Sequence, residues 1–374
     1  MAKQIALFNH KGGVGKTTMT FNLGWMLAKK GKKVIIVDCD PQCNLTGMVL
    51  GFKDAKRFES MYKSVGVTNI REGLAPAFES RPAPIKPVNC ESIRGRMEMP
   101  SLLHLLPGHI GLAEYEVPLG VAQALSGSLV TLQNLPGSLH NLFSKTADKY
   151  NADFILVDMS PSLGPINQNL LMTSDYFIVP MFPDYFSAMA TESLASILPK
   201  WSGWAKQAKK SPLLQEAIYP FPDKDPKFLG TIVQNYRVRD GEPAKAFGEW
   251  IEQIKIGVEE KLIPVLREND MLLPDESYIK TRALESHQHR FNFINPDFVN
   301  DQLISQPLLQ VSDFNSLIAL SQKHKVPVFD LTDDQIGQAG VILESTKRSM
   351  ERFRDLFSDG AEQIITLTEN AESY

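Results

Sequence analysis

One short segment near the N-terminus constrains the fold of this chain more than any other feature. An apolar stretch at residues 4–9 is followed by Lys11-Gly12-Gly13-Val14-Gly15-Lys16-Thr17-Thr18, and then by a helical pattern that ends at Gly31. A buried strand, a glycine-rich turn and a helix in this order form a phosphate-binding loop. We therefore expect an α/β protein with a doubly wound, mostly parallel sheet flanked by helices.

The chemistry of this loop suits the phosphates of a nucleotide. Glycine lets successive backbone N–H groups converge on phosphate oxygens, and the N-terminus of the following helix adds partial positive charge. We expect the Lys16 ammonium to contact the β- and γ-phosphates and the Thr17 hydroxyl to ligate Mg²⁺. The other nucleotide-binding residues of the loop are expected to be Gly12, Gly13, Val14, Gly15 and Thr18.

A second lysine, Lys11, stands at the start of the loop. With it, the segment KGGVGKTT resembles the deviant Walker A loop of the ParA/MinD/Soj family of P-loop NTPases. The resemblance implies that ATP is the nucleotide, that ATP binding closes a homodimer, and that Lys11 reaches the phosphates of the partner's ATP. Lys11 and Lys16 are then both catalytic, because each compensates the charge that develops on the phosphates.

Carboxylates follow two further predicted strands. The mostly apolar residues 33–37 lead into Asp38-Cys39-Asp40-Pro41-Gln42-Cys43-Asn44, which resembles the family's DxDPQxN segment, and residues 151–157 lead into Asp158. In a doubly wound sheet such strand ends lie beside the phosphate site. The resemblance implies that Asp40 is the catalytic aspartate, with Asp38 nearer the metal and Asp158, as a Walker B residue, contacting Mg²⁺ through water. The alternative is that Asp38 and Asp40 are only helix-capping residues.

Two later positions are candidates for contact with adenine. A buried-strand pattern at residues 229–235 ends in Asn235, and Ile263-Pro264 comes one predicted helix later. In the family that the chain resembles, the asparagine that ends this strand and the loop after an Ile-Pro pair flank the base, which implies roles for Asn235 and Pro264. An asparagine at a strand end can also be only a turn former.

The chain is longer than compact members of that family, so we expect one ATPase domain over residues 1–374 with insertions near 52–100, 201–228 and 267–325. The third insertion holds His287 and His289, but no carboxylate or cysteine stands at ligand spacing, which favours a solvated loop over a metal site. A helix is expected near 334–365. Acidic residues follow its cations, which favours packing on the core over the membrane binding of MinD-like proteins.

Composition narrows the class of protein. With 43% hydrophobic and 22% charged residues the chain has a soluble globular composition, and its net charge of −4 excludes nucleic-acid binding through bulk charge. Cys39, Cys43 and Cys90 form no CxxC pair, which argues against a disulfide framework or a zinc ribbon. No apolar run approaches a membrane span of about 18 residues. We expect a cytoplasmic or nucleoid-associated protein.

The resemblance implies a partition or positioning ATPase. Its ATP-bound dimer would bind DNA without sequence preference, and a ParB-like or other activating protein would trigger an otherwise slow hydrolysis. No helix-turn-helix precedes the loop, unlike plasmid proteins that repress their own operon. The alternatives are a regulatory ATPase that controls a neighbouring effector, a MinD-like membrane ATPase, and a metal-cluster ATPase, which lacks its cysteine ligands here. Candidate DNA contacts are Lys206, Lys209, Lys210, Arg237, Arg239, Lys280 and Arg282.

Overall fold

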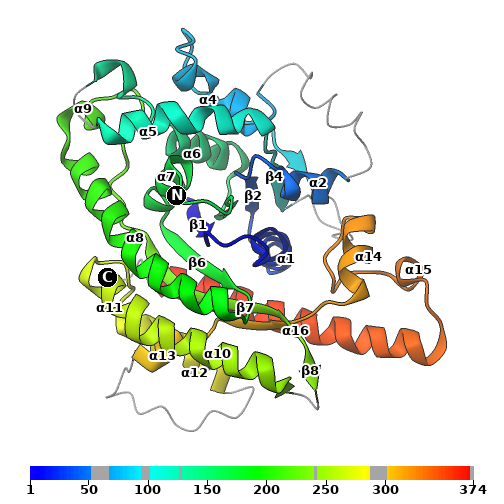
Figure 1. Cartoon of the computed structure of the whole chain (residues 1–374). Coiled ribbons are helices and arrows are strands. Elements are labelled where there is room, and N and C mark those ends of the chain that lie inside the picture. Colours follow the sequence, from blue (N-terminus) through cyan, green and yellow to red (C-terminus); the bar gives the residue numbers. More distant parts are fainter. Residues whose placement is uncertain (52–66, 94–101, 126–128, 240–241, 287–300, 371–374) are drawn as a thin grey trace. The chain divides into compact units, whose positions relative to one another are not determined.

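The computed structural model describes residues 1–51, 67–93, 102–125, 129–239, 242–286 and 301–370 (Figure 1). The chain forms two compact units. The first comprises Met1–Gly12, Lys16–Tyr176 and Lys200–Pro226, and the second comprises Gly13–Gly15, Phe177–Pro199 and Lys227–Tyr374.

The first unit is built on a mostly parallel sheet. Its strands lie in the order β1 (Lys3–Leu7), β5 (Phe154–Asp158), β2 (Val34–Asp38), β4 (Leu103–Leu106) and β3 (Glu91–Ser92). The first four are parallel, and β3 is an antiparallel edge strand. Leu7 and Asp38 both stand opposite Asp158, so β1, β5 and β2 end at the same level. This register brings the phosphate loop and two predicted carboxylates to one edge of the sheet.

Helical crossovers join these parallel strands, as parallel pairing requires. Helix α1 (Lys16–Lys29) lies beside the sheet in Figure 1, and most of its residues are buried. β2 and β5 are buried along their whole length, which explains their continuous apolar sequences. The other helices among the described residues of this unit are α2 (Asn44–Leu50), α4 (Ile70–Phe78), η1 (Ile110–Tyr115), α5 (Glu116–Ala124), η2 (Val130–Leu132), α6 (Ser138–Tyr150), α7 (Pro165–Met172) and α9 (Pro212–Gln215).

The second unit also contains parallel strands. β7 (Lys227–Tyr236) pairs with β10 (Leu309–Ser312), and β6 (Tyr176–Met181) enters this unit at Phe177. Short strands β8 (Val238–Arg239) and β9 (Glu242–Pro243) form a separate antiparallel pair. Helix α8 (Tyr185–Lys210) contributes to both units. Where the structure describes this unit, its remaining helices are α10 (Lys245–Gly257), the π-helical turn η3 (Val258–Leu262), α11 (Ile263–Glu268), α12 (Asp275–Ser286), α13 (Asp301–Ser305), α14 (Ser316–His324), α15 (Asp333–Ile336) and α16 (Gly340–Asn370).

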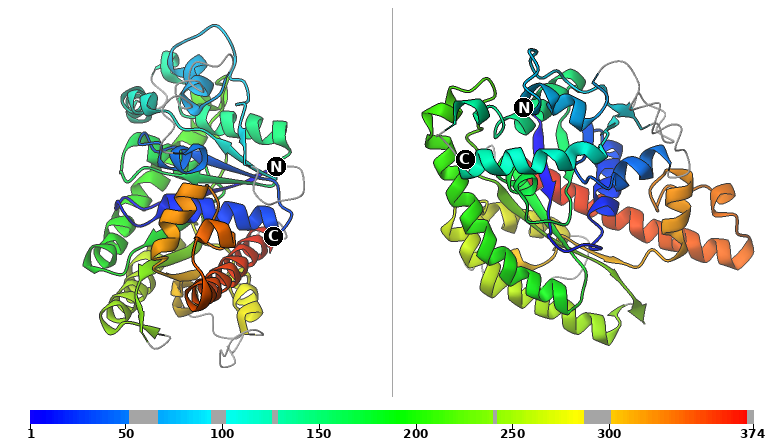
Figure 2. Two further views of the ribbon diagram at one scale, coloured as in Figure 1. Left: turned by 90° about the vertical axis from the view of Figure 1, so that its right-hand side faces the viewer. Right: turned by 45° about the horizontal axis from the view of Figure 1, so that its top comes forward.

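The C-terminal helix α16 packs on its own unit. Figure 2 shows it as one long helix, with α14 and α15 beside its N-terminal half. Phe353 and Phe357 are buried against Phe314, with ring centroids 4.8 and 6.3 Å away. No helix among the described residues is both long and apolar enough to cross a membrane.

The mostly parallel, helix-flanked sheet confirms the predicted fold class. The predicted insertions stay a prediction, and the third of them contains α12, α13, β10 and α14. Because β10 pairs with β7, this stretch contributes a strand to the sheet as well as connecting segments. His287 and His289 lie outside the described residues. The three cysteines are free thiols.

Candidate nucleotide site

The phosphate loop has the backbone that its glycines predict. Gly13 and Gly15 have φ angles of 73° and 72°, in the left-handed region that glycine enters without strain. The Asn9 side chain accepts a hydrogen bond from the Lys11 backbone N–H at 2.9 Å, which fixes the entry of the loop. Lys16 then begins α1, so the loop leads directly into a helix N-terminus, where backbone N–H groups are available to an anion.

Lys16 lies inside this loop. Its side chain is buried, and its Nζ donates to the carbonyl oxygens of Asn9 at 2.9 Å and Lys11 at 3.1 Å. Burial lowers the pKa of Lys16, whereas the charges of Asp158 and Asp40 raise it. A phosphate in the loop would favour the charged ammonium in the same way.

Asp158 is a buried carboxylate without a well-formed hydrogen bond to the described residues. It ends β5 and is 1% exposed, and neither carboxylate oxygen has a hydrogen-bond partner of good geometry. Burial and then the charge of Asp38 raise the pKa of Asp158 well above its usual range, and the Thr17 hydroxyl and Lys16 oppose this. An unpartnered carboxylate beside a hydroxyl fits a hard divalent cation such as Mg²⁺. In the described parts of the chain, no three His, Cys, Asp or Glu side chains form a metal cluster.

Asp38 differs because its carboxylate is fully engaged. Its Oδ2 accepts hydrogen bonds from the Thr46 N–H at 2.7 Å and the Thr46 hydroxyl at 2.6 Å, and its Oδ1 accepts one from the Asp40 N–H at 3.2 Å. The Thr46 hydroxyl in turn accepts from the Gly108 N–H at 2.8 Å. Burial raises the pKa of Asp38 to about 6, although the bonds from Thr46 lower it. Asp38 thus joins β2, α2 and the turn after β4.

Asp40 is positioned by the same segment. It is 7% exposed, and its Oδ1 accepts a hydrogen bond from the Gln42 N–H at 2.9 Å. The left-handed Cys43, with φ 55°, closes the turn by donating its N–H to the Asp40 carbonyl at 2.8 Å. The carboxylate of Asp40 therefore stands on a short, internally bonded turn between β2 and α2.

The two adenine candidates, Asn235 and Pro264, lie in different kinds of local structure. Asn235 lies exposed near the end of β7 with a left-handed φ of 66°. Pro264 lies in the first turn of α11, within a continuous helical stretch formed by α10, η3 and α11. The expectation of a loop directly after Ile263-Pro264 is therefore wrong, because the helix continues to Glu268. Proline lacks an N–H and clashes with the preceding turn, which accounts for the π-helical turn before it.

Gln234 is a residue of this region that we did not predict. It is 4% exposed, and its Nε2 donates a hydrogen bond to the Val14 carbonyl of the phosphate loop. A Cβ added to Gly15 would collide with the Gln234 carboxamide. The available signal was a glutamine at the end of the continuously buried stretch 228–234, directly before the exposed Asn235.

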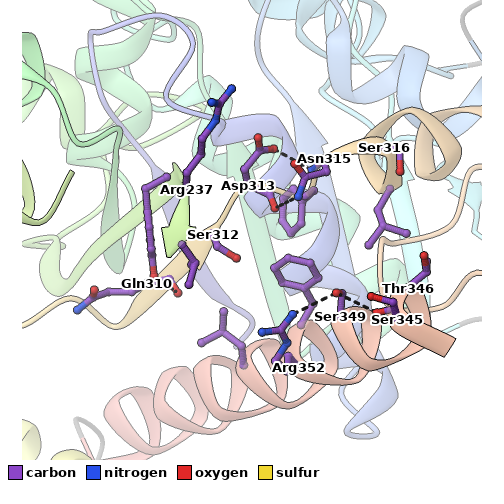
Figure 3. A pocket seen from close by; sticks show the side chains of 16 residues that line it. Arg237, Gln310, Ser312, Asp313, Asn315, Ser316, Ser345, Thr346, Ser349 and Arg352 are labelled. Atoms are coloured by element: carbon purple, nitrogen blue, oxygen red, sulfur yellow. Dashed lines mark hydrogen bonds between the residues drawn. The ribbon is translucent and has the colours of Figure 1, made fainter. Parts of the chain in front are cut away.

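A cavity of about 700 Å³ lies in the second unit, at the carboxyl ends of β7 and β10 and beside α16 (Figure 3). Tyr236 donates its hydroxyl to the Gln310 carbonyl at 3.2 Å. Arg352 donates to the Ser349 hydroxyl at 3.1 Å. The lining residues are Tyr236, Arg237, Val238, Gln310, Ser312, Asp313, Phe314, Asn315, Ser316, Leu317, Ser345, Thr346, Ser349, Arg352, Phe353 and Leu356.

Several of the predicted DNA contacts have other roles in the structure. Lys209 pairs with Asp225 at 2.8 Å and with Asp223 at 3.5 Å. Arg282 donates to the carbonyl oxygens of Gln306 and Pro307, which attaches α12 to the segment before β10. Arg237 lines the cavity. Lys210 and Lys280 are exposed.

Comparison with known proteins identifies the family. A family model described as an AAA domain (AAA_31) matches residues 2–208, which is more than half of the chain. An uncharacterized protein of Methanocaldococcus jannaschii is 30% identical over 67% of this chain and 78% of its own length. The chromosome-partitioning ATPase Soj of Thermus thermophilus is 31% identical over 52% of this chain and 60% of its own length. The chain thus spans less than two thirds of that relative.

Solved structures agree on the fold. The structure of pNOB8 ParA has a TM-score of 0.54 at 20% identity and covers 99% of both chains. The same protein bound to nonspecific DNA gives a TM-score of 0.51 at 18% identity, again over 99% of both chains. A mostly parallel sheet with a deviant Walker A loop defines a P-loop ATPase. The chain belongs to the ParA/MinD/Soj family of these ATPases.

Proposed function

We propose that this protein is an ATP-dependent, dimerising nucleotide switch that acts in DNA partition or cargo positioning. One observation carries the proposal: a buried lysine, Lys16, lies in a glycine loop beside the unpartnered carboxylate of Asp158. A polyphosphate with a divalent cation satisfies both groups together, because the phosphate accepts from Lys16 and the cation neutralises Asp158.

The phosphates would lie in the loop from Lys11 to Thr18, with the Thr17 hydroxyl and Asp158 holding Mg²⁺. The ion would neutralise charge on the β- and γ-phosphate oxygens. Asp38 would act on this site indirectly, because its oxygens are already engaged. Asp40 would orient the attacking water, as its position on the turn after β2 allows.

We place the base in the cavity at the ends of β7 and β10. Gln234 contacts the loop, and Tyr236, two residues further along β7, lines the cavity. Gln234 and Tyr236 stand opposite Val311 and Ser312, which are consecutive in β10, so the loop contact and the cavity lie at the same end of β7. Asn235, between them, keeps its proposed place near the base. We no longer propose that Pro264 contacts the base, because it lies within a helix.

Dimerisation and DNA binding belong to the same proposal. Lys11 is partly exposed at the entry of the loop, so it is accessible to a second copy of the chain. Relatives named for chromosome partition and a ParA structure with nonspecific DNA support a DNA-bound state. A ParB-like or other activating protein would then stimulate hydrolysis and release.

Two lysine substitutions test the nucleotide switch. Lys16→Ala removes the charge inside the loop and should abolish ATP binding in calorimetry. Lys11→Ala should bind MgATP but remain a monomer in light scattering, because its role is exerted in trans. Lys29→Ala, at the exposed end of α1, is the matched control and should behave as wild type in both assays. A wild-type protein that does not bind MgATP would overturn the proposal, and a dimeric Lys11→Ala protein would remove Lys11 from the interface.

A further inference from the structure

A single side-chain amide connects the phosphate loop to a strand 220 residues away in sequence. Gln234, near the end of β7, donates from Nε2 to the backbone carbonyl of Val14. The side chain is 4% exposed, so its amide is shielded from water that would compete for this bond. Burying such an amide costs free energy unless it is hydrogen-bonded, and here the partner is a loop carbonyl.

The direction of that carbonyl determines the direction of an N–H group in the loop. A trans peptide unit is planar, and its C=O and N–H bonds point in opposite directions. When Gln234 holds the Val14 carbonyl, the N–H of Gly15 in the same peptide unit points away from Gln234. In a phosphate loop it is the N–H groups that must converge on the anion.

The backbone around this peptide would otherwise permit it to turn over. Such a flip changes ψ of Val14 and φ of Gly15 together. Gly15 has φ 72°, and glycine adopts positive and negative φ with similar ease, so the residue itself does little to resist the flip. The flipped peptide would direct a carbonyl oxygen at the phosphates instead of an N–H.

We propose that Gln234 is a positioning residue for phosphate binding, which keeps the Val14–Gly15 peptide with its N–H directed into the loop. The proposal rests on the nucleotide-binding function above and assigns it a residue that the loop motif does not contain. Its contact is with the loop backbone, so its effect should concern the phosphates of the ligand and spare the base.

Gln234→Met tests this role, because methionine has a similar length and volume but no N–H donor. Gln363→Met is the matched control: Gln363 is 5% exposed, and its Nε2 also donates to a buried backbone carbonyl, that of Leu308, at 3.2 Å. Each variant loses one buried amide-to-carbonyl bond. Both should therefore lose similar thermal stability, while only Gln234→Met changes the phosphate loop.

The readout is the ratio of the affinities for ADP and AMP, measured by calorimetry with Mg²⁺. The β-phosphate raises affinity only if the loop N–H groups are correctly directed, so we expect Gln234→Met to lower this ratio by about tenfold or more. AMP affinity and the ratio in Gln363→Met should stay at the wild-type value. The inference would be overturned if the ADP-to-AMP affinity ratio were unchanged in Gln234→Met, or if this ratio fell equally in Gln363→Met. If wild type binds neither nucleotide, the proposed function itself fails.

Discussion

Asp38 and Asp158 stand opposite each other at the ends of β2 and β5, but their carboxylates differ in what they contact. Asp38 accepts three hydrogen bonds, whereas Asp158 accepts none of good geometry. Both residues follow apolar strand sequences, so the sequence alone cannot distinguish them. The difference arises from Thr46 and Gly108, whose donors reach Asp38 only after the chain has folded.

His140, in α6, should make the stability of the protein sensitive to acid. Burial and then the charge of Lys224 lower the pKa of His140 to about 4, although Asp175 and a backbone hydrogen bond at Thr173 oppose this. Lys224 also pairs with Asp175 at 2.7 Å. The unfolded chain, with an ordinary histidine pKa of about 6.5, binds more protons between these two values, so stability falls as pH decreases through this window.

We expect this histidine to remove about 2 kcal/mol from the unfolding free energy between pH 7.5 and pH 5. His140→Gln lacks the titrating ring. Urea unfolding of wild type and His140→Gln at the two pH values isolates the contribution of His140, because all other groups titrate equally in the two proteins. The advantage of wild type over His140→Gln should shrink on acidification. Parallel losses in the two proteins would show that His140 does not titrate in this window.

Among the elements, α15 and α16 show how a periodic pattern predicts a helix but not its break. The apolar spacing predicts one helix from residue 334 to 365. The structure instead ends α15 at Ile336, with Gly337 as its C-cap, and begins α16 at Gly340, and both glycines have positive φ. A capping box between Thr332 and Gln335 starts the short helix. These signals are local in the sequence, but the regular spacing of the apolar residues obscures them.

Phe357 should be the residue of α16 on which its packing depends most. It is fully buried between Phe329 and Phe314, with ring centroids 5.4 and 6.3 Å away. Phe357→Ala should lower the unfolding free energy by about 3–5 kcal/mol because it leaves a cavity. Val341→Ala, at a site that is 81% exposed in the same helix, should change it by about 0.5 kcal/mol or less. Equal effects in chemical denaturation would mean that α16 is not part of the folded core.

At the scale of the whole molecule, the net charge of −4 requires any DNA contact to be local. If the proposed function is correct, the ATP-bound protein should retard duplex DNA of any sequence. Its affinity should fall by about 10³-fold or more between 50 and 200 mM salt, since counterions are released on binding. ADP and the Lys16→Ala variant should give little retardation in the same gel-shift assay. No retardation with ATP at low salt would favour a regulatory ATPase that does not bind DNA.

The sequence was most informative where the structure is local. The phosphate loop, its strand and its helix are contiguous, so residues 3–29 could be predicted from glycine placement and apolar spacing alone. Contacts between distant segments could not. Gln234 contacts a loop that is 220 residues away in the sequence. Pro264 has neighbours in the sequence that suggest a loop, but it lies in a helix. Both outcomes depend on neighbours that only the folded chain provides.

The hydrogen bonds from Thr46 to Asp38 close the intervening chain into a small ring that carries Asp40. Gly108 touches this ring so closely that a Cβ there would lie 2.9 Å from the Asp38 carboxyl carbon. A ring closed at both ends has few conformations, so little entropy is left to lose when Asp40 meets a ligand. Any response of this segment to hydrolysis should therefore be the displacement of a rigid piece, in which Asp40, α2 and the turn at Gly108 move together.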